Sequence, residues 1–189
     1  MRKIIVSEFL SLDGVMEGPG PDDTFKLAGW TMRYMNPEIG QYKFAELFAS
    51  DAHLLGRVTY QGFAAAWPSR TDEMGFAARM NTLPKYVVST TLKMAGWENS
   101  HIINGNIPEE ISKLKQQPGQ DILVAGSATL VKTLIDLDLI DEYHLLIYPV
   151  ILVSGKHLFK DGSRATLKLI ETKAFRSGVA LHIYQPERN

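Results

Sequence analysis

Cysteine is absent from this chain of 189 residues, and so is any long run of apolar residues. The lack of cysteine excludes a disulfide framework, a thiolate metal site and a thiol nucleophile. No window approaches the ~18 consecutive apolar residues that a membrane-spanning helix needs. Glu8 places a charge near the start of the chain, before the apolar core of a signal peptide could develop. We therefore expect a soluble cytoplasmic protein.

An excess of charge of one sign is also missing. The 20 basic residues nearly balance the 21 acidic ones, and Lys and Arg gather nowhere without acids between them. The basic surface that a nucleic-acid-binding protein needs is therefore not expected, which argues against nucleic acid as a partner. The five histidines are dispersed without an i, i+4 pair, so no metal site is expected. A G-x-S-x-G elbow is absent too, which argues against a serine hydrolase.

The order of strand and helix signals predicts an α/β fold. A hydrophobic content of 45% is enough for a full core, and the length is typical of one domain over residues 1–189. Alternating strands and helices followed by a strand-rich tail predict a three-layer fold: a mostly parallel mixed sheet, helices on both faces and a C-terminal antiparallel hairpin. Strands are expected at 3–9, 52–56, 85–90, 121–125, 142–147, 166–175 and 179–185, and helices at 37–50, 57–65, 72–80, 108–116 and 127–137.

Two of the expected buried strands stop at a glycine and turn directly into a helix. The first turn is Gly56-Arg57-Val58-Thr59, and the second is Gly126-Ser127-Ala128-Thr129. Each presents backbone N–H groups and the positive end of a helix dipole to a possible anion. Arg57 adds a planar fork suited to a phosphate monoester. Two such turns predict a ligand with two phosphate positions, and a phosphorylated dinucleotide such as NADPH fits best.

Plainer interpretations of these residues stay open. Gly56 can serve a tight turn, Arg57 an ion pair, and Ser127 a helix N-cap in any protein. A third candidate lies at the end of the strand 85–90, where Ser89 and Thr90 place hydroxyls at a strand end, the edge at which open α/β sheets bind ligands. The Rossmann and P-loop fingerprints are both absent.

The ordered set of motifs resembles the dihydrofolate reductase superfamily, in particular its branch with the riboflavin-biosynthesis reductase domain and small stand-alone bacterial proteins. The motifs are Ser11-Leu12-Asp13-Gly14, Leu55-Gly56-Arg57-Val58-Thr59-Tyr60, Val88-Ser89-Thr90-Thr91, Val124-Ala125-Gly126-Ser127 and Tyr148-Pro149-Val150-Ile151-Leu152. The resemblance implies that Gly56, Arg57 and Thr59 hold cofactor phosphates, with Arg57 near the 2′-phosphate. It also implies that Ser89 and Thr90 lie by the adenosine ribose phosphate, and that Gly126, Ser127, Ala128 and Thr129 cradle the pyrophosphate.

The substrate side departs from dihydrofolate reductases. Those enzymes carry a carboxylate on the first helix, and the stretch Gly40-Gln41-Tyr42 offers none; Glu38 is the nearest acid. The resemblance puts Asp13 and Trp67 on the substrate side, while Asp13 is equally well explained as a turn former and Trp67 as a core residue. We expect an NADPH-dependent reductase of a small heterocyclic or carbonyl-like substrate, acting as a homodimer. The alternative is a non-catalytic nucleotide-binding protein that keeps the fold without turnover.

Overall fold

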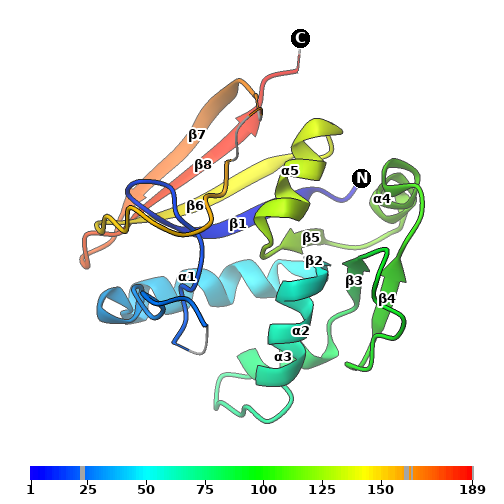
Figure 1. Cartoon of the computed structure of the whole chain (residues 1–189), viewed down its shortest axis with the longest axis horizontal. Coiled ribbons are helices and arrows are strands. Elements are labelled where there is room, and N and C mark those ends of the chain that lie inside the picture. The colour runs from blue at the N-terminus through cyan, green and yellow to red at the C-terminus, as the bar shows by residue number, and fades with distance from the viewer. Residues whose placement is uncertain (22–23, 160–161, 163, 189) are drawn as a thin grey trace.

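Within the part of the chain that the structure describes, eight strands form one mixed sheet in the order β4-β3-β2-β5-β1-β6-β8-β7. The computed structural model describes residues 1–21, 24–159, 162 and 164–188. The strands are β1 (Ile4–Ser11), β2 (Ser50–Gly56), β3 (Lys85–Val88), β4 (Ser100–Ile103), β5 (Asp121–Val124), β6 (Glu142–Tyr148), β7 (Leu167–Ala174) and β8 (Ala180–Pro186). The strands from β4 to β6 in this order, namely β4, β3, β2, β5, β1 and β6, run parallel to one another. Strands β8 and β7 add an antiparallel hairpin at one edge, as Figure 1 shows. The expected mixed sheet and terminal hairpin are confirmed.

Helices cover both faces of this sheet, as expected from the sequence (Figure 1). The helices are α1 (Pro37–Phe48), α2 (Arg57–Ala66), α3 (Phe76–Thr82), α4 (Ile107–Gln116) and α5 (Ala128–Asp136), with a 3-10 turn at Met32–Tyr34. Helices α4 and α5 pack on the face that carries Ile4, Val6 and Leu54. Helices α1, α2 and α3 pack on the opposite face, around Ile5 and Leu55. The period of two along β1 and β2 therefore divides the core into two layers.

The third helix begins later than its predicted range, 72–80. The carboxylate of Asp72 accepts the N–H groups of Phe76 and Ala77, at 2.9 and 2.5 Å. Asp72 thus stabilises the first turn from outside the helix, while Gly75 takes a left-handed conformation at φ +82° immediately before it. An acidic side chain that accepts first-turn N–H groups marks the start of a helix while standing before it. The predicted range counted Asp72 as part of the helix and therefore began too early.

The turn between β7 and β8 confirms the hairpin predicted around Ser177-Gly178. The N–H of Gly178 donates to the carbonyl of Phe175 at 2.9 Å, and Phe175 N–H donates to Val179 at 2.8 Å. Gly178 has a φ of +88°, which glycine adopts at little cost. The hairpin therefore has the turn residue that its backbone requires.

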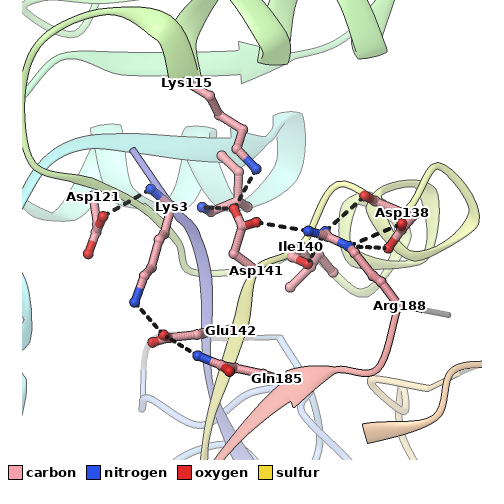
Figure 2. A network of polar contacts seen from close by, with 10 residues as sticks. Lys3, Lys115, Asp121, Asp138, Ile140, Asp141, Glu142, Gln185 and Arg188 are labelled. Atoms are coloured by element: carbon pink, nitrogen blue, oxygen red, sulfur yellow. Dashed lines mark hydrogen bonds and ion pairs between the residues drawn. The ribbon is translucent and has the colours of Figure 1, made fainter. Parts of the chain in front are cut away.

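A network of polar contacts ties the C-terminal residues to the start of β6 (Figure 2). The carboxylate of Asp141 accepts the N–H of Ile4 at 2.8 Å and the ammonium of Lys115 at 2.6 Å. The guanidinium of Arg188 bonds the carboxylate of Asp138 and the carbonyl of Ile140. These contacts lie at the amino ends of β1 and β6, the edge of the sheet opposite to the predicted binding turns.

None of the helices in the described residues has the length and apolar content that crossing a membrane takes.

Candidate functional site

The residues predicted to bind a ligand lie at one level across neighbouring parallel strands. Gly56 pairs with Val88 in the register of β2 and β3. Leu54 pairs with Val124, so Gly56 and Gly126 each stand two residues further along, side by side. The carboxyl ends of β3, β2 and β5 therefore meet at the same edge, where ligands of open α/β sheets bind.

The two glycine turns touch each other directly. The N–H of Gly56 lies 3.5 Å from the carbonyl oxygen of Gly126. A Cβ atom at position 56 would lie 2.6 Å from Ser127 Oγ, and one at position 126 would lie 2.8 Å from Thr59 Oγ1. Gly126 also has a φ of +78°, and its peptide bond to Ser127 is cis. Glycine at both positions is thus required by close approach of the two turns.

Helix α2 begins without a side-chain cap, whereas α1, α4 and α5 each have one. Its N-cap is Gly56, which has no side chain to accept a hydrogen bond. Asn36, Asn106 and Ser127 cap α1, α4 and α5 with side-chain oxygens. The first N–H groups of a helix have no intrahelical acceptor. The start of α2 therefore leaves N–H groups for an external anion to bind.

Arg57 and Thr59 flank this uncapped start. Arg57 is exposed, and its Nη1 donates to Gln61 Oε1 at 3.1 Å, one turn along the helix. Thr59 lies against Gly126 of the other turn. The guanidinium is thus held on the surface of α2 by Gln61, and it has further donors with which an exposed arginine can bind a phosphate monoester.

Ser89 and Thr90 follow β3, which ends at Val88 and not at residue 90 as predicted. The Ser89 hydroxyl accepts the N–H groups of Leu92 at 2.9 Å and Thr91 at 3.2 Å. This side-chain turn ends the strand, because it takes backbone donors away from the sheet. Ser89 is buried and Thr90 is exposed beside it. Thr90 is therefore the more accessible hydroxyl at this strand end.

Asp13 anchors the segment that follows β6. Its carboxylate accepts the hydroxyl of Ser11 at 2.7 Å and the N–H groups of Leu152 and Val153 at 3.1 and 2.8 Å. Burial raises the pKa of Asp13, but these donors outweigh it and lower the pKa to about 2. The ionised carboxylate holds the Tyr148-to-Leu152 segment against the end of β1, which favours the structural interpretation of Asp13 over a proton relay.

Trp67 lies at the other end of α2 from Gly56. It caps the carboxyl end of α2, and ten residues of helix span about 15 Å, so Gly56 stands at the far end. Its ring packs edge-on against Phe63 and at a tilt of 39° against Phe76, with the Arg70 guanidinium 4.9 Å from its centroid. The structure gives Trp67 a packing role between α2 and α3, the core interpretation left open by the sequence.

A buried carboxylate on the first helix escaped the sequence analysis. Glu46 of α1 accepts the hydroxyl of Ser7 at 2.8 Å and pairs with the ammonium of Lys43. Its other oxygen lies 3.0 Å from His144 Nδ1 and 3.2 Å from the hydroxyl of Tyr42. Glu46 stands seven residues after the buried Ile39, and this helical spacing is the signal that could have placed it on the inner face.

Glu8 is the second carboxylate that the sequence analysis missed as a site residue. It lies on β1 two residues beyond Val6, which pairs with Val124, so Glu8 is level with Gly126. Its Oε1 accepts the N–H of Gly126 at 2.5 Å. A charged residue on the same strand face as Ile4, Val6 and Leu10 is the sequence signal for such a buried acid.

The strand order and the paired glycine turns define a dihydrofolate reductase-like α/β fold. Residues 2–181 match the model of the RibD C-terminal domain, so the chain belongs to that family. It is 37% identical over 188 residues to the uncharacterized protein YyaP of Bacillus subtilis (strain 168), covering 97% of this chain and 94% of that protein.

Two solved structures share the fold at low sequence identity. A pyrimidine reductase-like protein from Corynebacterium diphtheriae superposes with a TM-score of 0.68 at 13% identity, covering 100% of this chain and 93% of that one. RibD of Acinetobacter baumannii gives a TM-score of 0.62 at 16% identity, covering 99% of this chain and 58% of that one. The chain therefore has a reductase-type fold.

Proposed function

We propose that the protein is an NADPH-dependent reductase that transfers a hydride to a small heterocyclic or carbonyl-like substrate. The observation that carries the proposal is the contact between the two glycine turns, with the uncapped start of α2 and the exposed Arg57 beside them. Two adjacent anion positions and one separate cation match a pyrophosphate and a 2′-phosphate. Membership of the RibD C-terminal domain family supports the same conclusion.

Several of the predicted cofactor residues have distinct roles in this proposal. The first turns of α2 and α5 would bind the pyrophosphate, because both helices begin where Gly56 and Gly126 lie against each other. Arg57 would hold the 2′-phosphate through the guanidinium donors that do not bond Gln61. Thr90, exposed after β3, would reach the adenosine ribose, while Ser89 fixes the turn that presents it.

The chain contributes position and electrostatics to the reaction, since the hydride is supplied by the nicotinamide of the bound cofactor. Strands β1 and β6 pair as far as Ser11 and Tyr148, beyond the level of Gly126. The segment that Asp13 holds closes this end of the sheet. The substrate would lie between this closed end and the cofactor turns. We also propose that the protein acts in the cytoplasm as a homodimer.

A turnover assay tests the proposed activity. The purified protein would be mixed with NADPH and, in turn, with pterins, pyrimidinones and quinones, while the absorbance of NADPH is followed. We expect steady NADPH oxidation with at least one class. Tight NADPH binding without turnover on any of them would contradict the reductase and favour the non-catalytic nucleotide-binding protein.

A further inference from the structure

Glu8 sits directly behind one of the two proposed cofactor turns. Only 7% of its surface is exposed, and its Oε1 accepts the N–H of Gly126 at 2.5 Å. Gly126 begins the segment Gly126–Thr129, in which the first turn of α5 would bind phosphate. A phosphate at that turn would therefore lie on the other side of a glycine that is bonded to a carboxyl group.

The surroundings of Glu8 offer little to balance a negative charge. Its strand face is otherwise apolar, with Val6 and Leu10 as its neighbours on that face. Among the described residues, no ammonium or guanidinium forms a salt bridge with it. The charged groups of α1 that act on Glu8 have opposite signs, Lys43 and Glu46, and they pair with each other on the opposite face of β1.

The charge state of Glu8 follows from this environment. Burial raises the pKa of its carboxyl to about 8, although the hydrogen bond from Gly126 and the charge of Lys43 act in the other direction and Glu46 adds to the rise. His144 contacts Glu46, which also pairs with Lys43, and it makes no hydrogen bond to Glu8 among the described residues. The turn at Gly126 is thus held by a buried carboxyl group whose pKa lies well above its ordinary value.

We propose that Glu8 is a positioning residue that couples cofactor binding to a proton: NADPH binds at the Gly126–Thr129 turn beside a protonated Glu8. This inference rests on the proposed NADPH site. An ionised Glu8 would place a buried negative charge next to the pyrophosphate, and like charges at short range in a protein interior repel strongly. Where the free protein has lost the Glu8 proton, binding takes up one proton from solvent, so the charge at the turn stays balanced.

The test compares the wild type with Glu8→Gln, which keeps the shape and an oxygen that can accept from Gly126 but cannot ionise. The dissociation constants of NADPH and NADH would be measured from about pH 7.5 to about pH 9.5, where the 2′-phosphate, with a second pKa of about 6, no longer changes its charge. We expect the wild-type constants for both cofactors to rise with pH, by up to about tenfold per unit, and those of Glu8→Gln to rise much less. Glu73→Gln, an exposed change, serves as the matched control and should behave like the wild type.

Equal pH dependence in the wild type and in Glu8→Gln would overturn the inference while leaving the proposed function intact. Failure of the wild type to bind NADPH at any pH would overturn both. If Glu8→Gln does not fold, calorimetry of the wild type in two buffers of different ionisation enthalpy gives the protons bound per NADPH. We expect proton uptake at about pH 8.5, and its absence would contradict the proposed role of Glu8.

Discussion

Ser127 occupies the space in which a side chain at position 56 would have to lie. A Cβ atom at Gly56 would stand 2.6 Å from Ser127 Oγ, the same atom that caps α5 by accepting the N–H of Leu130. One pair of residues thus joins the starts of α2 and α5. The position of the first turn and the cap of the second helix cannot change independently.

Gly56→Ala is expected to destabilise the protein by about 1–3 kcal/mol, because the added methyl group must displace Ser127 or shift the turn. The matched control is Gly62→Ala in the middle of α2, where a Cβ atom meets nothing within 4 Å. That change should stabilise by about 0.5–1 kcal/mol, since alanine favours the helix. Urea denaturation measures both. Equal stability changes of the same sign would contradict the close approach.

How far the sequence predicts this site depends on how local each signal is. Gly56 and Gly126 were found because a glycine after an apolar run marks a strand-to-helix turn within a few residues of chain. Their contact followed from placing both turns at strand ends of one parallel sheet. Arg57 and Thr59 were found for the same reason, since they belong to the first of these turns.

Glu8 and Glu46 could not be found in this way, because their partners are distant in sequence. Glu8 bonds Gly126, and Glu46 meets His144 only after α1 packs beneath β6. Trp67 shows the converse. Its residue type suits a flat ligand, but its ring packs on Phe76 at the other end of α2 from Gly56.

Glu46→Gln is expected to change the acid stability of the protein. Burial raises the pKa of Glu46, but the charge of Lys43 and the hydrogen bond to His144 outweigh it and lower the pKa from 4.5 to about 2. A lowered carboxyl pKa contributes stability above the unfolded value, and this stability is lost as the pH falls from 4.5 towards 2. The variant should be less stable at neutral pH by about 1–3 kcal/mol and should lose less stability on acidification. An unchanged pH profile of the urea midpoint would contradict the stabilising role of the contacts that Glu46 makes with Lys43 and His144.

Asp141→Ala is expected to destabilise by about 1–3 kcal/mol, because it removes the acceptor of the Ile4 N–H and leaves the Lys115 ammonium without its carboxylate (Figure 2). The Lys115 side chain is only 10% exposed, so water can replace little of the lost contact. Asp136→Ala, which breaks the exposed pair with Lys132, is the control and should cost no more than about 0.5 kcal/mol. Thermal denaturation compares the two, and similar losses would contradict the argument.

The edge strand β7 predicts where a homodimer would form. Among the described residues it pairs with β8 and with no other strand, and Leu169 and Ile170 are 50% and 47% exposed. An unpaired edge with apolar side chains can add the strand of a second copy. Small-angle scattering should show a dimer for the wild type and a monomer for Ile170→Lys. A monomeric wild type would contradict the prediction, and an unchanged dimer in the variant would place the interface elsewhere.

The measurement that tests the central claim most directly is the ratio of the dissociation constants for NADH and NADPH. The wild type should prefer NADPH, and Arg57→Ala should lose affinity for NADPH by about tenfold or more with little change for NADH, since only NADPH carries the 2′-phosphate. Arg70→Ala, at the other end of α2, should leave the ratio unchanged. A wild type without preference for NADPH, or an equal loss for both cofactors in Arg57→Ala, would contradict the proposed site.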